Sequence, residues 1–196
     1  MEKINFIKTF IPQGDFREKY EHGGMMVRHI AAVLDEKMGA YECYECTVPI
    51  GEYDEGEIQK AFIEFTAKMD ALKLKQAKVE KIAEITAYDT SDKVNGFVLN
   101  GLLVWLDKAT RVGLMNSTTI AKAAGQQTTT LWLGDVKLEV DCDKAIQLLS
   151  ALEMYALECF NVTAAHKAAV TDLKTIKEVE AFDVTADYPK QLEMKL

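Results

Sequence analysis

The sequence contains no apolar run that approaches the ~20 residues of a membrane-spanning helix. Its first ten residues also lack the basic start, the apolar core and the small-residue cleavage site of a signal peptide. We therefore expect no membrane partner and a protein that stays in the compartment where it is made.

Histidine and cysteine are scarce, with three and four residues in a chain of 196. The histidines, His22, His29 and His166, have no ligand partner at helical spacing. Cys43 and Cys46 lie in an alternating, strand-like stretch, where side chains three apart point to opposite faces. One such pair is weak support for zinc, and no helix start follows it as in a thioredoxin-like site. We therefore expect no metal site and no cofactor.

The common catalytic signatures are also absent. The chain has no Gly-rich phosphate loop, no Gly-x-Ser-x-Gly elbow and no His-Glu-x-x-His motif. Asp141 and Asp143 are close together, but they stand where a helix should begin, which favours a capping role. We therefore expect no catalytic residues and a protein that is not an enzyme, and we rank a concealed activity behind two binding functions.

Positive charge is in deficit, with 23 Lys and Arg against 31 Asp and Glu and a net charge of -8. Phosphate backbones repel an acidic chain, so we expect no nucleic-acid partner. Lysines do gather between 68 and 81, but at this net charge a solvated helix face is the favoured interpretation. The rest of the composition, 48% hydrophobic and 28% charged, predicts a globular protein with a sizeable core.

The periodicity of the apolar residues predicts an α+β fold in three parts. Residues 1–52 should form a β-rich N-terminal module, residues 53–87 a long connecting helix, and residues 88–196 a C-terminal α+β domain. In the first part we expect a strand at 4–7, an irregular loop at 12–24, and a hairpin of 25–34 and 41–48 around a turn at 35–39.

The long helix carries an apolar seam whose spacings alternate between four and three, a heptad pattern that Gln76 interrupts. Its members are Ile58, Phe62, Phe65, Met69, Leu72 and Val79. A single helix cannot bury such a seam alone, so either the C-terminal domain or a second copy of the chain must cover it. The pattern leaves open a homo-oligomer through this helix and packing within one subunit.

The C-terminal part should contain two hairpins, each followed by a helix. Asn100-Gly101 predicts the first tight turn, and Asp107 can cap a helix that Gly125 ends. After a second turn at Gly134, a helix with a broad apolar face should be the central core helix. We expect a further helix over 164–181 and a last strand over 191–196.

These hairpin–helix segments resemble each other. Residues 99–110 and 133–146 both run strand, turn, strand, acidic cap and Asp-Lys-Ala, and a weaker echo joins 84–99 to 178–194. Convergent cap chemistry and a true duplication explain this equally well. The pattern predicts repeated β-hairpin–helix units packed on the central apolar helix.

Candidate partner-binding residues follow from the same patterns, because aromatic and large apolar side chains dominate protein interfaces. They are Phe62, Phe65, Met69 and Leu72 of the seam, and Trp105 and Trp132 at matching hairpin ends. For the two tryptophans, packing against the core is the competing interpretation.

From residue 87 onward the chain resembles a family of uncharacterised proteins. The resemblance rests on AYDTSDKVNGFVLNG, VWLDKATRVGLMNSTTIAKAAGQQTTTLWLGD, KAIQLLSALEMYALECFNVTAAHKAAV and EVEAFDVTADYP, and the N-terminal part matches more loosely. The family is a domain of unknown function that recurs in phages and prophages of gut Bacteroidales, often near tail and other structural genes. No catalytic residue can be transferred from it.

The resemblance implies a phage or prophage protein that binds phage structural or assembly proteins, as a tail-associated component or an assembly chaperone. It also implies residence in the cytoplasm of the bacterial host or incorporation into the virion. The alternative is a small phage accessory protein that binds a host defence factor or a small ligand.

Overall fold

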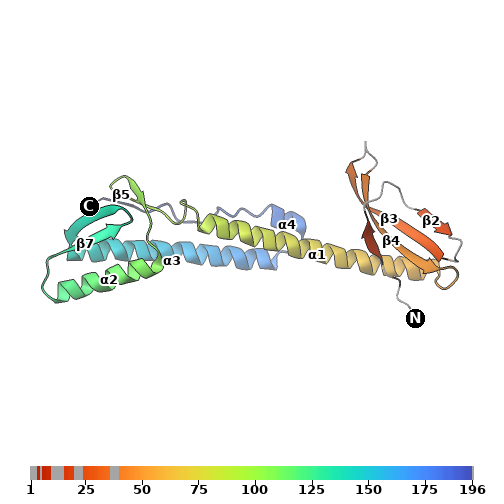
Figure 1. The fold of residues 1–196 in the computed structure, drawn as a ribbon, viewed down its shortest axis with the longest axis horizontal. Coiled ribbons are helices and arrows are strands. Elements are labelled where there is room, and N and C mark those ends of the chain that lie inside the picture. Colours follow the sequence, from red (N-terminus) through yellow and green to blue (C-terminus); the bar gives the residue numbers. More distant parts are fainter. Residues whose placement is uncertain (1–3, 5, 10–15, 20–23, 36–39, 196) are drawn as a thin grey trace. The chain divides into compact units, whose positions relative to one another are not determined.

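The computed structural model describes residues 4, 6–9, 16–19, 24–35 and 40–195 (Figure 1). The chain divides into two compact units, residues 1–73 and residues 74–196. Helix α1 (Glu55–Asp89) begins in the first unit and ends in the second. The structure confirms the α+β fold class.

The first unit is an antiparallel sheet with the N-terminal part of α1. The strand order is β1-β4-β3-β2, formed by β1 (Ile7–Thr9), β4 (Ala40–Pro49), β3 (Gly24–Asp35) and β2 (Phe16–Lys19). A reciprocal capping box starts α1, because Glu57 N–H donates to Asp54 and Asp54 N–H donates to the Glu57 carboxylate, at 2.8 and 2.9 Å.

The hydrophobic core of this unit covers the first half of the apolar seam. Val27, Tyr44, Cys46, Val48 and Ile58 are buried together, and the partly buried Phe62, Phe65 and Met69 pack against them. We expected the C-terminal domain or a second copy to cover these residues. The N-terminal sheet covers them because its own apolar face also needs burial, and the sheet and the helix bury each other.

Two N-terminal predictions are corrected by the structure. The first strand lies at Ile7–Thr9 and so begins three residues after the start of the predicted strand at 4–7. Strand β2 forms within the segment predicted to be an irregular loop. Strand β2 lies at the edge of the sheet, where charged residues are common. It lacks the alternation of apolar residues by which a strand is recognised in a sequence. The predicted hairpin of β3 and β4 is confirmed, while residues 36–39 of its turn lie outside the described residues.

The second unit contains the C-terminal part of α1 together with shorter helices, the long α3 and small sheets (Figure 1). Its elements are β5 (Phe97–Leu99), β6 (Leu102–Val104), α2 (Lys108–Ala123), β7 (Thr128–Leu133), β8 (Val136–Asp141), α3 (Cys142–Asp172), α4 (Ile176–Glu180) and β9 (Glu193–Met194). The sheets have the orders β6-β5-β9 and β7-β8. Helices α2 and α3 pack antiparallel, since Arg111 pairs with Glu153 and Lys122 with Asp143.

The central core helix is α3, as predicted. Ala145, Leu148, Leu149 and Leu152 are at most 1% exposed and pack with residues of both hairpins, among them Phe97 and Leu131. Further along, Val170 of α3 packs with Ile85 of α1 and with Val184, and the Lys78 ammonium donates to the Thr171 carbonyl at 2.6 Å. Helix α3 thus organises the whole second unit.

The two hairpin–helix units have the turns and caps that the sequence predicts. Asn100 and Gly101 have φ values of 51° and 84°, the positive pair of a type I′ turn, and Gly134 has a φ of 64°. Asp107 accepts from Thr110 N–H at the start of α2, and Asp141 accepts from Asp143 N–H at the start of α3. The hairpin β5–β6 precedes α2, and the hairpin β7–β8 precedes α3.

The end of the chain departs from the prediction. The predicted helix over 164–181 is two elements, because α3 continues without a break to Asp172 and the short α4 starts afresh. No helix breaker follows Phe160, whereas a capping box between Thr175 and Glu178 starts α4. The last strand is only Glu193–Met194, and it pairs in parallel with β5.

The turn at Gly101 gives a first testable prediction. Gly101→Val should lower the free energy of unfolding by about 1–2 kcal/mol, because a β-branched residue is forced to positive φ. No atom lies within 4 Å of the position that a Cβ would take, so the cost is conformational rather than steric. Chemical denaturation measures it, and Gly101→Asn is the control that should cost less. An unchanged midpoint for the valine variant would contradict the turn.

Candidate functional site

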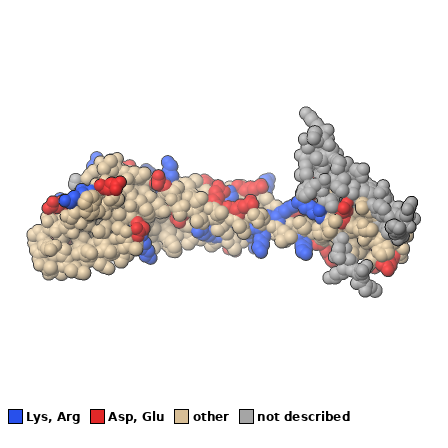
Figure 2. All heavy atoms as spheres, viewed as in Figure 1, with Lys and Arg blue, Asp and Glu red and all other residues tan. Residues whose placement is uncertain are grey.

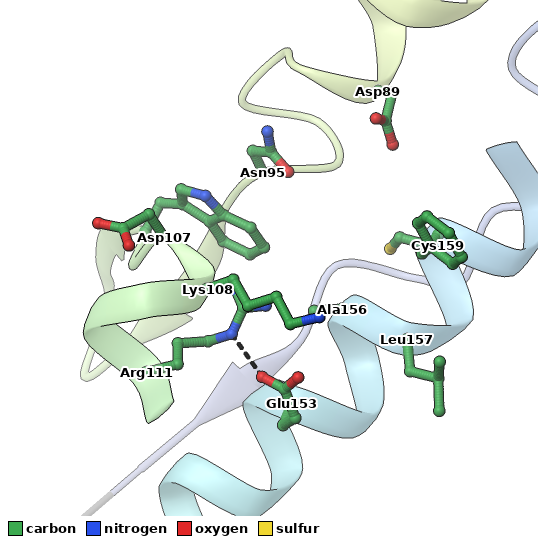
Figure 3. Close-up of a pocket in the computed structure, with 11 residues that line it drawn as sticks. Asp89, Asn95, Asp107, Lys108, Arg111, Glu153, Ala156, Leu157 and Cys159 are labelled. Carbon is green, nitrogen blue, oxygen red and sulfur yellow. Dashed lines mark hydrogen bonds and ion pairs between the residues drawn. The ribbon is translucent and has the colours of Figure 1, made fainter. Parts of the chain in front are cut away.

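A cavity of about 440 Å³ opens in the second unit, where the end of α1, the start of α2 and the middle of α3 meet (Figure 3). Its lining residues are Asp89, Asn95, Trp105, Asp107, Lys108, Arg111, Glu153, Ala156, Leu157, Cys159 and Phe160. The cavity therefore combines an apolar part with several charged and amide groups, the usual composition of a binding pocket.

Arg111 forms one wall and is committed to the fold. Its Nε donates to Glu153 Oε2 at 2.7 Å (Figure 3). Its Nη1 donates to the Leu106 carbonyl at 2.7 Å. The guanidinium also lies 5.2 Å from the Trp105 ring centroid, in cation–π range. Because Arg111 is only 7% exposed and these contacts neutralise its charge, it joins α2 to α3 rather than offering a free cation.

Asp107 is likewise committed, as the cap of α2. Its Oδ1 accepts from the Thr110 N–H at 2.9 Å, and its Oδ2 accepts from the Thr110 hydroxyl at 2.7 Å. The hydrogen bond from the Thr110 backbone is the main reason that the pKa of Asp107 lies below its usual range. Both carboxylate oxygens therefore have partners in the fold.

Asp89, the last residue of α1, is held by a chain of hydrogen bonds. Thr163 Oγ1 donates to Asp89 Oδ1 at 2.7 Å and lies 2.6 Å from the Tyr188 hydroxyl. A threonine hydroxyl has a single hydrogen, so Tyr188 must be the donor in the second bond. The hydrogen bonds run from Tyr188 through Thr163 to Asp89 and fix the Asp89 carboxylate. Figure 3 shows this carboxylate at the cavity.

The cavity has no activated nucleophile in its one cysteine. Burial raises the pKa of the Cys159 thiol, which disfavours the reactive thiolate at neutral pH. In the N-terminal unit, burial also raises the pKa of Cys46, to about 11. Within the described residues, no three His, Cys, Asp or Glu side chains are grouped to hold a metal ion.

Large apolar side chains lie exposed beside the cavity, on α3. Met154, Leu157 and Phe160 follow at intervals of three and are 57%, 48% and 66% exposed. Leu157 and Phe160 also line the cavity. Figure 2 shows few charged side chains on the visible surface of α2. We call Met154, Leu157 and Phe160 the α3 strip.

Residues 76–186 match the family described as a domain of unknown function (DUF4376). This chain belongs to that family. No curated protein and no solved structure matches the chain. Every residue that lines the cavity and every residue of the α3 strip falls inside the DUF4376 region, whereas the N-terminal sheet precedes it.

Across the described residues, no helix has the length and apolar character needed to span a bilayer.

The partner-binding candidates from the sequence have different environments in this DUF4376 protein. Phe65 stacks edge-on against Tyr44 at 4.9 Å, and Phe62 and Met69 pack in the same core. Leu72 is 49% exposed. Trp105 lines the cavity, and Trp132 of β7 is 58% exposed. The structure therefore brings only Trp105 into the candidate site, and self-association through α1 stays a prediction.

Sequence reasoning missed Asp89 and the α3 strip. In the sequence Asp89 belongs to a polar turn. Its partner Thr163 is 74 residues away, and Tyr188, which bonds Thr163, is 99 residues away. The sequence does contain an indication of the strip, because the apolar face of α3 is broader than the neighbouring elements can cover. Leu157 and Phe160 fall outside the row of buried residues that includes Leu152, Tyr155 and Cys159.

Proposed function

We propose that this DUF4376 protein is a non-enzymatic phage or prophage protein that acts through protein–protein binding, as a tail-associated component or an assembly chaperone. The α3 strip and the adjoining cavity form the contact surface for the partner. The observation that carries this proposal is the exposure of Met154, Leu157 and Phe160 together on one helix. Contiguous apolar surface of this kind marks interaction sites, because exposed apolar area has a cost in water.

The cavity strengthens the choice of this surface over other exposed apolar residues. Interfaces are dominated by a few side chains that insert into pockets, with near-neutral contacts around them. Here an apolar strip adjoins a cavity of about 440 Å³, so a partner can place an anchoring side chain beside its apolar contact. Ile120 of α2 is 69% exposed but does not line this cavity.

The phage setting is supported by the sequence resemblance described above, which concerns the same region as the DUF4376 match. A second candidate function is a small phage accessory protein that binds a host defence factor or a small ligand. The cavity favours the small-ligand form of this candidate, since its volume lies within the range of small-molecule sites.

The proposal predicts that the chain associates with phage particles or with tail intermediates through the α3 strip. In cells producing the phage or prophage that encodes it, the double variant Leu157→Ser/Phe160→Ser should reduce this association by about tenfold or more, because interface anchors are often worth more than 1.4 kcal/mol. Quantitative mass spectrometry of sedimented particles and of intermediates measures the amount bound. Presence in particles indicates a component, and presence only in intermediates indicates a chaperone.

Ile120→Ser is the matched control, since it removes an apolar side chain that is exposed elsewhere on the same unit. It should leave the association unchanged. Absence of the wild-type chain from both particles and intermediates would contradict the proposal, and a small molecule found in the purified protein by native mass spectrometry would favour the second candidate.

A further inference from the structure

We propose that the cavity receives a basic side chain, lysine or arginine, of the partner protein, and that Asp89 is the residue that recognises its charge. This inference rests on the proposed function, since it names the chemistry of the partner at the same surface.

Asp89 is prepared for a cationic partner. Its Oδ1 accepts the Thr163 hydroxyl at 2.7 Å, while its Oδ2 accepts no hydrogen bond from the residues that the structure describes. Figure 3 shows its carboxylate directed from the end of α1 toward the cavity. The C-terminal end of a helix carries partial negative charge, and α1 ends at this residue. A fixed carboxylate with one unused oxygen at such a position favours a donor with positive charge.

The other acidic groups at the cavity are already paired. Glu153 is held by Arg111 at 2.7 Å, and both oxygens of Asp107 accept from Thr110. Among the described residues, Asp89 is therefore the one acidic group of the lining that has no ion-pair partner and does not have both carboxylate oxygens hydrogen-bonded. Asp89 and Lys108 are therefore the two lining residues whose charges have no ion-pair or capping partner among the described residues.

Lys108 lines the cavity from the opposite side, in the first turn of α2 (Figure 3). Its side chain is exposed, and its ammonium has no hydrogen-bond or ion-pair partner among the described residues. Such a flexible, hydrated cation can turn into solvent with little cost, whereas the Asp89 carboxylate is held in place. The rigid group is the better recognition element, because binding does not have to order it.

The walls suit the aliphatic stem of a basic side chain. Trp105, Leu157 and Phe160 form the apolar part of the lining. Lysine and arginine bury their methylene stems along such surfaces while the charged head reaches a polar group. At about 440 Å³ the cavity holds one such side chain together with a neighbouring apolar one from the same segment. The net charge of -8 on the chain also favours encounter with a basic partner.

Binding of short blocked peptides to the full chain tests this assignment. In a Trp132→Phe background, Trp105 is the single tryptophan and reports on the cavity by its fluorescence. The probes are acetyl-Leu-Arg-Leu-amide, its citrulline counterpart, which is neutral and nearly isosteric, and its glutamate counterpart. We expect saturable binding of the arginine peptide, binding at least about tenfold weaker for citrulline, and none for glutamate, since a hydrogen bond to a charged group contributes about 1.5–3 kcal/mol.

Asp89→Asn should weaken binding of the arginine peptide by about tenfold or more, while its side-chain oxygen can still accept from Thr163. The matched control is Asp92→Asn, which removes an exposed carboxylate three residues away that does not line the cavity. Lys108→Ala should leave the affinity unchanged or raise it. Far-ultraviolet circular dichroism confirms that each variant is folded.

Two results would overturn the assignment. The first is preferred binding of the glutamate peptide with loss on Lys108→Ala, which would make the cavity an anion site. The second is the absence of any fluorescence change with folded protein at millimolar peptide. If the peptides do not bind but association with particles still depends on Leu157 and Phe160, the cavity assignment is wrong and the proposed function still holds. Peptide binding without association in phage-producing cells leaves the cavity assignment standing and removes the phage role.

Discussion

Replacing Leu152 by alanine should lower the free energy of unfolding by about 2–5 kcal/mol. Leu152 lies at the centre of α3, is fully buried, and belongs to the core that joins both hairpins to this helix. The substitution removes apolar contacts and leaves a cavity that packed neighbours such as Leu148 and Leu149 fill only in part. Urea denaturation followed by circular dichroism measures the loss.

Leu157→Ala is the matched control, with the same chemistry on the same helix. Leu157 is 48% exposed, so its truncation should change the free energy of unfolding by about 0.5 kcal/mol or less. A stability loss at Leu157 equal to that at Leu152 would mean that the α3 strip is part of the protein's own core. A small loss at Leu157 combined with reduced particle association is the result that fits a contact surface.

The elements that the sequence predicted well are those specified by local chemistry. Positive φ at Asn100 and Gly101, the caps at Asp107 and Asp141, and the stop at Gly125 each depend on a few neighbouring residues. Such signals need no knowledge of the rest of the fold. Both hairpin–helix units follow from them, whereas the role of α3 as the central core helix follows from the breadth of its apolar face.

The candidate site could not be predicted in this way, because it depends on contacts between distant segments. Asp89, Thr163 and Tyr188 come from the end of α1, the middle of α3 and the C-terminal segment. Nothing in the local pattern around any one of them indicates the other two. The exposure of Phe160 has the same origin, since an apolar residue on a broad helix face is buried or exposed according to where its neighbouring elements end.

The spacing of apolar residues in α1 correctly predicted which face of the helix is apolar, but it did not predict which element covers that face. The spacing of Phe62, Phe65 and Met69 identifies one face of a helix, and the structure packs that face in a core. The pattern does not say which surface covers the face, and the strands of the N-terminal sheet supply it. Sheet and helix each bring an apolar face that must be buried, so their pairing is decided by the fold as a whole.

Replacing Gly96 by alanine should lower the free energy of unfolding by about 3 kcal/mol, at the upper end of the cost of overpacking. A Cβ at Gly96 would lie 2.5 Å from the Asp92 carbonyl oxygen and 2.9 Å from a methyl group of Leu103. The first contact is with backbone, so the segment from Asp92 to Gly96 must move. That segment also contains the Val94 carbonyl, which accepts the buried Tyr155 hydroxyl at 3.1 Å.

The movement should reach the cavity, because Asn95 lies within the same segment and lines it. Gly96→Ala should therefore change the fluorescence of Trp105 in the Trp132→Phe background as well as the unfolding midpoint. Gly113→Ala is the control in α2, where no atom lies within 4 Å of the added Cβ. It should raise the free energy of unfolding by about 0.5–1 kcal/mol, because alanine is favoured over glycine in a helix. Equal stabilities for the two variants would contradict the close approach at Gly96, since the same methyl group would then meet open space at both positions.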